Sequence, residues 1–250
     1  LLANIYLHYV LDLWVQQWRK RHARGDIYIV RYADDFVMGF QYKNDAEQFK
    51  IDLKKRLSDF KLSLNESKTQ LIEFGRFAKS NRRARKESKP KTFDFLGFTH
   101  ICSVRWGSEQ FALLRVSIKK KLRAKIREIK ETLRRNINRS PYETGKWLNK
   151  VLTGYFNYFA VPRNGHSLNV MRTEVCKLWL KTLRRRSQKG RKLNWQVLNK
   201  FVRFFIPHTR IRHPYPNQRF HLWLDVGAVC VSSARTDLCR RPGFKRIKPL

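Results

Sequence analysis

Hydrophobic and polar positions follow a helical period at the start of the chain, and two short apolar runs come next. Residues 1–20 place apolar side chains on one helical face and predict a core helix. Ile27–Tyr32 and Phe36–Phe40 are rich in β-branched and aromatic residues, and only Ala33-Asp34-Asp35 separates them. The pattern therefore predicts two strands joined in a β-hairpin, with two carboxylates at its tip.

A helix and two short strands are expected after the hairpin. Asn44 is predicted to cap a helix whose apolar positions between Ala46 and Phe60 repeat at steps of three and four. Leu62–Leu64 and Leu71-Ile72 then indicate short strands on the two sides of a turn at Asn65–Lys68.

A basic segment and a further strand complete this part of the chain. Residues 76–91 are polar, basic and poor in apolar residues, so we expect an exposed loop there. Phe93–His100 has a strand pattern and is expected to end near a turn at Trp106-Gly107.

Helical periodicity dominates from residue 116 onward. Ser117 is expected to cap a helix whose apolar stripe ends at Leu133. Ser140-Pro141-Tyr142-Glu143 combines a cap, a proline in the first turn and a capping-box glutamate, and so predicts a second helix. Further helices are expected over 168–186 and 195–205. The fold class predicted is an α+β part with the β-hairpin, followed by an all-α part.

The charge balance indicates a polyanionic partner. The 250-residue chain has 55 Lys and Arg against 19 Asp and Glu, a formal net charge of +36. Trp, Tyr and Phe are interleaved with the basic residues, which favours nucleic acid over a membrane surface. The most apolar stretch, Leu1–Trp18, is interrupted by His8 and Asp12, so no membrane span is predicted. Four scattered cysteines without a C-x2-C pair fit a reducing, cytoplasmic compartment.

The pair Asp34-Asp35 is the most informative candidate for catalysis. Template-directed polymerisation uses two divalent metals about 4 Å apart, and Mg²⁺ prefers carboxylate oxygens. A tight hairpin would hold both aspartates at the end of two apolar strands. The alternative is an ordinary turn, because aspartate is common in turns.

Several ordered motifs resemble the reverse transcriptases of group II introns. Tyr32-Ala33-Asp34-Asp35 looks like the reverse transcriptase signature, and residues 1–7 look like the family's preceding helix. Trp147–Asn149 and Gly154–Phe159 resemble the characteristic helix of the maturase-specific domain, and Pro207–Pro216 resembles the tail that follows it. The resemblance implies the C-terminal part of the palm over 1–115, the thumb and maturase-specific helical domain over 116–206, and an irregular basic tail over 207–250.

The resemblance also implies roles for individual residues. Asp34 and Asp35 would be catalytic and hold Mg²⁺, with Tyr32 and Ala33 beside the nucleotide and primer. Lys68 would neutralise phosphate charge of the incoming nucleotide; a solvated turn lysine is the alternative. Residues that would contact the primer end are Leu96 and Gly97, for which the alternative is a core strand with a bulge glycine.

RNA binding is expected in the helical part, through phosphate contacts and stacked bases. A solvated charged face is the alternative, although the scarcity of acidic residues argues against it. The candidate residues are Lys121, Arg123, Lys125, Arg127, Arg184, Arg185, Arg186, Lys189, Arg191 and Lys192.

The resemblance implies an RNA-directed DNA polymerase and splicing maturase of a mobile element. Its partners would be group II intron RNA, a DNA primer or target and deoxynucleoside triphosphates; homodimer formation stays open. Family polymerases use a third carboxylate upstream of the hairpin, so we expect this chain to be an N-terminally truncated fragment that does not polymerise alone. The competing hypotheses are a non-catalytic RNA-binding splicing cofactor, a decayed remnant and a generic basic nucleic-acid protein.

Overall fold

The computed structural model describes residues 2–105, 107 and 110–215, and it divides the chain into two compact units, Leu1–Arg123 and Ala124–Leu250. Small antiparallel sheets and several helices occur in the described residues, which confirms the mixed α and β content expected from the sequence. No helix among these residues is long and apolar enough to cross a membrane.

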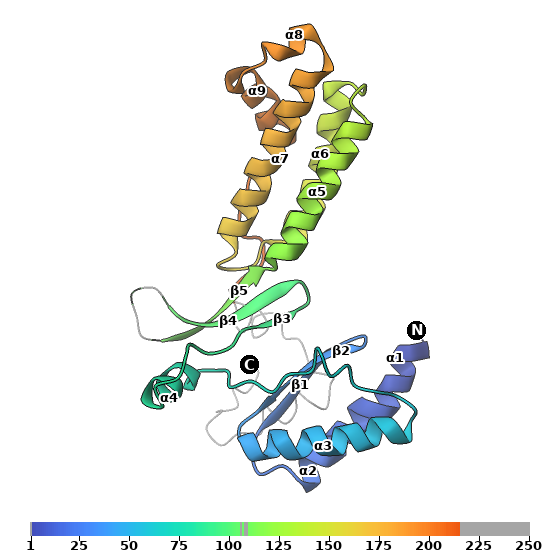
Figure 1. Ribbon diagram of the computed structural model, residues 1–250, viewed down its shortest axis with the longest axis vertical. Helices are drawn as coiled ribbons and strands as arrows, with labels where there is room; N and C mark the ends of the chain where they lie inside the picture. Colours follow the sequence, from blue (N-terminus) through green and yellow to red (C-terminus); the bar gives the residue numbers. More distant parts are fainter. Residues whose placement is uncertain (1, 106, 108–109, 216–250) are drawn as a thin grey trace, which may run out of the picture. The chain divides into compact units, whose positions relative to one another are not determined.

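The first unit begins with three consecutive helical segments, α1 (Leu2–Leu7), the π-helix η1 (His8–Asp12) and α2 (Leu13–Arg21). An antiparallel hairpin follows, formed by β1 (Ile27–Tyr32) and β2 (Asp35–Phe40) (Figure 1). Both the helix over 1–20 and the hairpin were predicted from the sequence, and both are confirmed. Their shared core with α3 (Lys43–Asp59) contains Val10, Leu11, Val15, Trp18, Ile27, Phe49, Leu53 and Leu57.

The start of α3 differs from the prediction. Tyr42 occupies the N-cap position and makes no side-chain capping bond, so the prediction that Asn44 caps the helix is wrong. Asp45, which is buried, accepts hydrogen bonds from the backbone N–H groups of Arg24 (3.0 Å) and Gly25 (3.2 Å). The carboxylate in the first turn of α3 therefore fastens the loop before β1.

The segment after α3 contains a turn and a helix. The turn at Asn65–Lys68 is confirmed, because the N–H of Lys68 donates to the carbonyl of Asn65 at 3.1 Å. The short strands expected over 62–72 are not formed in this described stretch, since neither side finds a pairing strand. The prediction of an exposed loop over 76–91 is wrong for residues 78–84, because these residues form the helix α4 (Ala78–Ala84).

A three-stranded antiparallel sheet completes the first unit. It runs in the order β3 (Phe93–Phe95), β4 (Phe98–Val104) and β5 (Phe111–Ser117). The single strand predicted over 93–100 is therefore wrong: Leu96 and Gly97, with φ +48° and +81°, form a turn that pairs Phe95 with Phe98. The turn expected at Trp106-Gly107 lies partly outside the described residues, because Trp106 is not among them.

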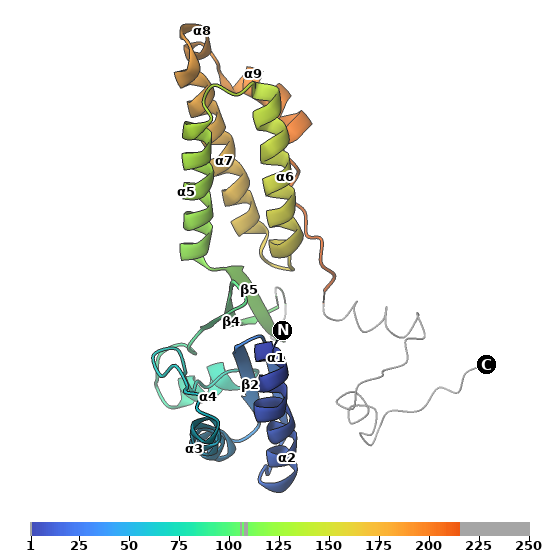
Figure 2. The same ribbon diagram turned by 90° about the vertical axis from the view of Figure 1, so that its right-hand side faces the viewer.

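The second unit is helical. It comprises most of α5 (Lys119–Arg135), together with α6 (Pro141–Phe159), α7 (Gly165–Arg186), the short α8 (Gln188–Arg191) and α9 (Trp195–Phe205). Both views place α5 and α6 alongside α7 (Figures 1 and 2). The fully buried side chains include Leu148, Leu152, Phe156, Leu168, Met171, Val175, Trp179 and Leu198.

The first residues of α5 and α6 show which of the two predicted N-caps is formed. At α6 the predicted capping box forms: the N–H of Glu143 donates to Oγ of Ser140 at 3.1 Å, and Oε2 of Glu143 accepts from the N–H of Ser140 at 3.3 Å. At α5 the prediction is wrong, because Ser117 is the buried last residue of β5 and the helix begins at Lys119.

The described segment after α9, residues 207–215, is irregular, as expected, but it is attached to the helices. The N–H groups of Arg212 and His213 both donate to the carbonyl of Ala160, at 2.9 and 3.2 Å. Nε of Arg172 donates to the carbonyl of Pro207 at 3.3 Å. Residues 216–250 of the expected tail lie outside the described residues.

Candidate functional site

The tip of the hairpin is a two-residue turn. Tyr32 pairs with Asp35, so Ala33 and Asp34 alone connect the strands, and Asp35 is the first residue of β2. Ala33 has a φ of +54°, a left-handed conformation that costs an alanine about 1–2 kcal/mol. This strained turn contains Asp34 and is followed at once by Asp35, and both residues are exposed.

The two faces of the hairpin have different environments. Side chains directly opposite each other share a face, and the pair Ile29 and Met38 packs against the core. Tyr32 and Asp35, which lie opposite each other, belong to the other face, where Tyr28, Val30 and Tyr32 are 48%, 57% and 66% exposed. The hairpin thus presents a carboxylate beside an uncovered aromatic ring.

Arg31 connects the turn to the first helices. Its Nε and Nη2 donate to the two carboxylate oxygens of Asp12 at 2.8 and 2.6 Å, a bidentate ion pair. Its Nη1 donates to the carbonyl of Ala33 at 2.8 Å and to Oδ1 of Asn4 at 3.3 Å. One guanidinium therefore ties the strained residue of the turn to η1 and α1.

The electrostatics of this ion pair favour the charged forms. Burial of the Asp12 carboxyl opposes its ionisation, but the hydrogen bonds and charge of Arg31, helped by His8, outweigh burial and hold the pKa of Asp12 below its ordinary value. The hydrogen bonds to Asp12 outweigh desolvation at Arg31 and raise the pKa of its guanidinium. Both groups are therefore charged at neutral pH.

The tip of the hairpin offers two carboxylates to a divalent cation, but no third acidic or metal-binding side chain beside them among the described residues. Asp34 and Asp35 offer carboxylate oxygens, the ligands that Mg²⁺ prefers. Within the described part of the chain, neither carboxylate has a hydrogen bond or ion pair, so both are available as ligands. No group of three or more His, Cys, Asp or Glu that could hold a metal exists among the same residues.

Lys68 lies in the exposed turn after α3. The turn is closed by the bonds to the carbonyl of Asn65, and Oγ of Ser67 donates to the Asn65 side chain at 2.7 Å. Glu66 pairs with Lys54 of α3 at 2.5 Å, and this contact fixes the turn to the helix. The structure shows no hydrogen bond or ion pair that brings Lys68 to either hairpin aspartate, among the residues it describes.

Leu96 and Gly97 have a conformational role that the sequence did not reveal. Both have positive φ, as a two-residue hairpin turn requires. Gly97 is buried, and its carbonyl accepts a hydrogen bond from the N–H of Ile118 at 3.1 Å. The glycine therefore joins the sheet to the start of α5, and a contact with a primer stays a prediction.

The basic residues predicted on α5 flank its buried stripe. Lys121 and Lys125 are one turn apart on one side of the stripe, and Arg123 and Arg127 are one turn apart on the other. Lys125 is half-buried and pairs with Glu128 at 2.7 Å, while the other three side chains are exposed. Three of these four cations are thus free of carboxylate partners among the described residues.

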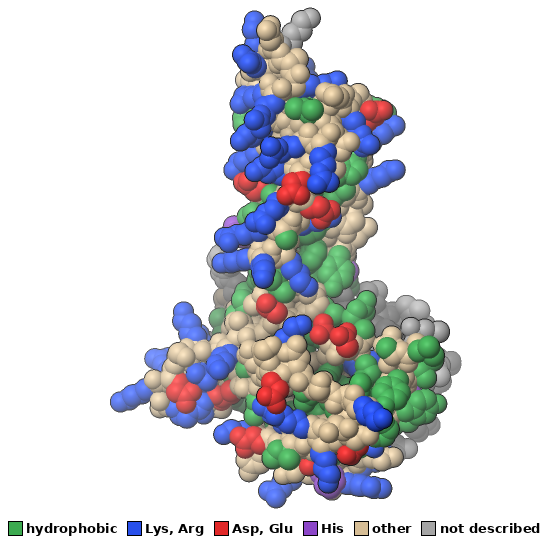
Figure 3. Space-filling model, turned by 45° about the vertical axis from the view of Figure 1, so that its right-hand side comes forward, with side chains coloured by type: hydrophobic (Ala, Val, Ile, Leu, Met, Phe, Trp, Pro, Cys, Tyr) green, Lys and Arg blue, Asp and Glu red, His purple; other side chains and the backbone are tan. Residues whose placement is uncertain are grey.

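The second basic group surrounds the end of α7. Nε of Arg184 donates to the carbonyl of Leu193 at 2.7 Å, and Nη2 of Arg186 lies 3.4 Å from the carbonyl of Asn138. Arg185, Arg191 and Lys192 are exposed; the side chain of Lys189 lies outside the described residues. Figure 3 shows Lys and Arg side chains over much of the helical unit, with few carboxylates among them.

The comparison with protein families bears on the first unit. Residues 1–100 match the family model described as reverse transcriptase (RNA-dependent DNA polymerase). The reverse transcriptase match contains the whole hairpin with Asp34 and Asp35, the turn of Lys68 and the Leu96-Gly97 turn. A search among curated proteins found no match to the chain.

Sequence reasoning missed the roles of Asp12 and Arg31: Arg31 donates to the carbonyl of Ala33 in the hairpin turn, and Asp12 holds Arg31. Asp12 was read only as a polar interruption of an apolar helix. A signal was present, because Arg31 lies two residues after Ile29 and so shares the inward face of the strand with Ile27 and Ile29. A charged residue at an inward position requires a partner, and Asp12 is the acidic residue available in the preceding helix.

Proposed function

We propose that this chain is the C-terminal part of a group II intron reverse transcriptase and maturase. The observation that carries the proposal is the hairpin, which presents the consecutive residues Asp34 and Asp35 exposed, with no partner among the described residues, within the region that matches reverse transcriptases. The first unit would belong to the palm. The helical unit would be the thumb and the maturase-specific domain.

At the hairpin, the chain's own residues would position nucleic acid and metal ligands. A divalent cation such as Mg²⁺ would activate the primer hydroxyl and stabilise the leaving pyrophosphate. Asp34 and Asp35 would supply carboxylate ligands, and Tyr32 would offer its exposed ring to a base or sugar of the primer. Arg31 would stabilise the strained turn through its bond to the Ala33 carbonyl.

In the helical unit, RNA would be held mainly through its phosphates. Arg123 and Arg127 of α5, Arg185 in the last turn of α7, and Arg191 and Lys192 after that helix are exposed and belong to a chain of net charge +36. Guanidinium groups match phosphate oxygens bidentately, which favours arginine at such contacts. The proposed RNA is that of a group II intron.

The isolated chain is proposed to bind RNA without extending a primer. Polymerisation in this family requires a third carboxylate, and the described residues contain no such group beside Asp34 and Asp35. A non-catalytic RNA-binding splicing cofactor is the second candidate function, and it is favoured by the same missing ligand.

The first experiment compares RNA binding by the whole chain. Group II intron RNA and an unrelated structured RNA of equal length would be titrated against wild type and an Arg185→Gln/Arg191→Gln/Lys192→Gln variant. The expected result is tighter binding of the intron RNA and a loss of about tenfold in the variant, because phosphate contacts are removed. Equal affinity for both RNAs would contradict the maturase proposal and favour the hypothesis of a generic basic nucleic-acid protein.

The second experiment separates the two candidate functions through metal binding. Mn²⁺ added to the chain should broaden the amide NMR signals of Ala33, Asp34 and Asp35 if the hairpin is a remnant or part of a polymerase site. The Asp34→Asn/Asp35→Asn variant should lose that broadening and retain RNA affinity. Unchanged signals at the hairpin, at Mn²⁺ concentrations that broaden other acidic positions, would favour the non-catalytic cofactor.

A further inference from the structure

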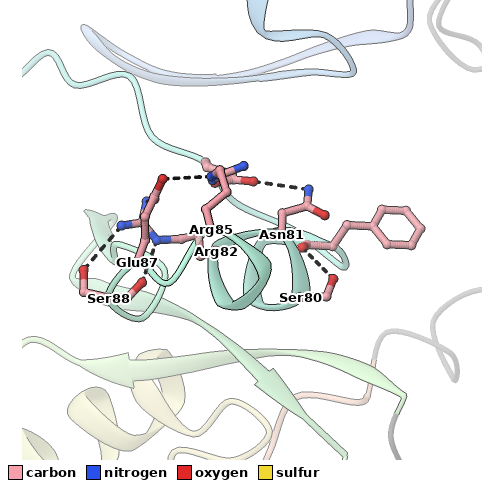
Figure 4. Close-up of polar contacts among 8 residues, drawn as sticks. Ser80, Asn81, Arg82, Arg85, Glu87 and Ser88 are labelled. Carbon is pink, nitrogen blue, oxygen red and sulfur yellow. Dashed lines mark hydrogen bonds and ion pairs between the residues drawn. The ribbon is translucent and has the colours of Figure 1, made fainter.

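The segment around α4 separates its charges into a paired inner side and an unpaired outer side. Residues 73–91 contain two acidic residues, Glu73 and Glu87. Both carboxylates are used within the segment: Glu87 pairs with Arg85 at 2.8 Å and with Arg82 at 3.1 Å, and Glu73 pairs with Arg85 (Figure 4).

Further hydrogen bonds make this inner network a structural unit. Arg82 donates from Nε to the carbonyl of Ser88 at 2.7 Å and from Nη2 to its Oγ at 3.3 Å (Figure 4). Asn81 donates to Glu73 at 3.3 Å, and the N–H of Glu87 closes the helix end on the carbonyl of Arg82 at 2.8 Å. The chain on both sides of α4 is thereby held to the helix.

The segment is also fastened to the three-stranded sheet. The rings of Phe74 and Phe93 meet edge to face at a centroid distance of 5.0 Å, and the N–H of Gly75 lies 3.4 Å from Sγ of Cys102. Ala78 is buried at the start of the helix. The helix therefore has a defined inner side, and its outer side is not needed for attachment.

The outer side carries cations that have no carboxylate partner among the described residues. Lys79 and Arg83 are one helical turn apart, and all of the group are exposed. Phe77, beside them, is 66% exposed. The group, called here the α4 basic surface, consists of Arg76, Lys79, Arg83, Lys86, Lys89 and Lys91.

This arrangement does not serve the stability of the helix. Like charges one turn apart repel, and Lys79 lies in the first helical turn, where the helix dipole disfavours a cation. Lys86 follows the helix with a φ of +57°, which disfavours a side chain at that position. A polyanion that binds the outer side would offset these costs.

We propose that the α4 basic surface binds the phosphate backbone of nucleic acid, independently of base sequence. The choice of partner rests on the proposed function, because the segment lies inside the reverse transcriptase match. Phosphates would contact the outer cations, and the ring of Phe77 would offer a stacking surface to an unpaired base or sugar. A membrane is disfavoured because α4 has no apolar outer face.

The test uses the full chain and a labelled RNA–DNA hybrid duplex, titrated over a range of salt concentrations. The variant is Lys79→Gln/Arg83→Gln/Lys86→Gln. The matched control is Lys20→Gln/Arg21→Gln/Lys55→Gln, which removes the same charge from exposed positions of the same unit. A charge-preserving variant, Lys79→Arg/Arg83→Lys/Lys86→Arg, should bind as wild type does.

The α4 variant should weaken binding at least about tenfold and reduce the slope of log K against log salt by about 2–3, because each lost phosphate contact contributes about 0.9. The control should change the slope by less than about 1. Equal slopes in the α4 variant and the control, with thermal melting unchanged in both, would overturn the proposal.

Two other outcomes are distinct. If the wild-type chain binds no nucleic acid, the proposed function fails and this inference fails with it. If wild type binds the duplex, but the α4 variant loses only its affinity for phosphatidylserine vesicles, the surface is a lipid site. The inference is then wrong while the proposed function stands.

Discussion

The ion pair between Arg31 and Asp12 allows the role of the hairpin tip to be tested by stability. Arg31→Gln removes both bonds to Asp12 and the bond to the Ala33 carbonyl. Exposed ion pairs contribute about 0–1 kcal/mol, whereas loss of one partner from a buried pair costs about 3–5 kcal/mol. The two side chains are 15% and 24% exposed, so we expect an intermediate cost of about 2 kcal/mol.

Hydrogen–deuterium exchange measures this cost where it arises. A loss of about 2 kcal/mol corresponds to a roughly 30-fold loss of protection at the amides of β1 and β2. Amides in α6 and α7 provide an internal control and should keep their protection, because they belong to the other compact unit. Arg31→Lys should recover part of the loss, since a lysine keeps the charge without the bidentate geometry.

A double-mutant cycle with Asp12→Asn decides whether the pair itself is responsible. The coupling energy should be at least about 1 kcal/mol, above the roughly 0.3–0.5 kcal/mol within which independent mutations add. The pKa of Asp12 is lowered in the folded state, so its contribution should be complete at neutral pH and disappear as the pH falls through the folded value. Additive single mutants, or a coupling that persists in strong acid, would refute the argument.

The remaining predictions concern other elements. Burial lowers the pKa of His100, so stability of the β3–β4–β5 sheet should fall as the pH drops below 6.5, and His100→Gln should remove this fall; calorimetry across pH checks it. Ser140→Ala should destabilise the helical unit by about 1 kcal/mol in urea titrations through loss of the capping box; the control is Thr173→Ala, at an exposed position within α7. Gly145→Ala should cost about 1–3 kcal/mol in the same assay, because the new Cβ would lie 2.6 Å from the ring of Phe205; Gly154→Ala, with open space around it, is its control.

Local pattern was enough for the elements whose stability is local. The β-branched and aromatic residues of Ile27–Tyr32 and Phe36–Phe40, with a short connection between the two runs, predicted the hairpin. The capping box at Ser140 could also be predicted from the sequence, because its two hydrogen bonds join residues that are three positions apart. The position of Asp34 and Asp35 at the tip follows from the same hairpin.

Elements held by distant residues were not predictable in this way. Residues 76–91 lack an apolar stripe, yet α4 forms within them. Arg85, next to the end of this helix, pairs with Glu73, which lies twelve residues earlier, and with Glu87. Leu96 is not a typical turn residue, yet pairing of Phe95 with Phe98 places it at positive φ. Each of these depends on partners that sequence periodicity does not show.

For the candidate site as well, some properties follow from the sequence and others from the packing of distant segments. The sequence determined which residues could hold a metal or bind phosphate, because those capacities belong to the side chains of Asp34, Asp35 and the many arginines and lysines. Tertiary structure decided which of them are free to do so. It joined Asp12 of η1 to Arg31 of β1, paired Arg85 with Glu73, and left Arg83 exposed, because burial and these ion pairs depend on how separate segments pack.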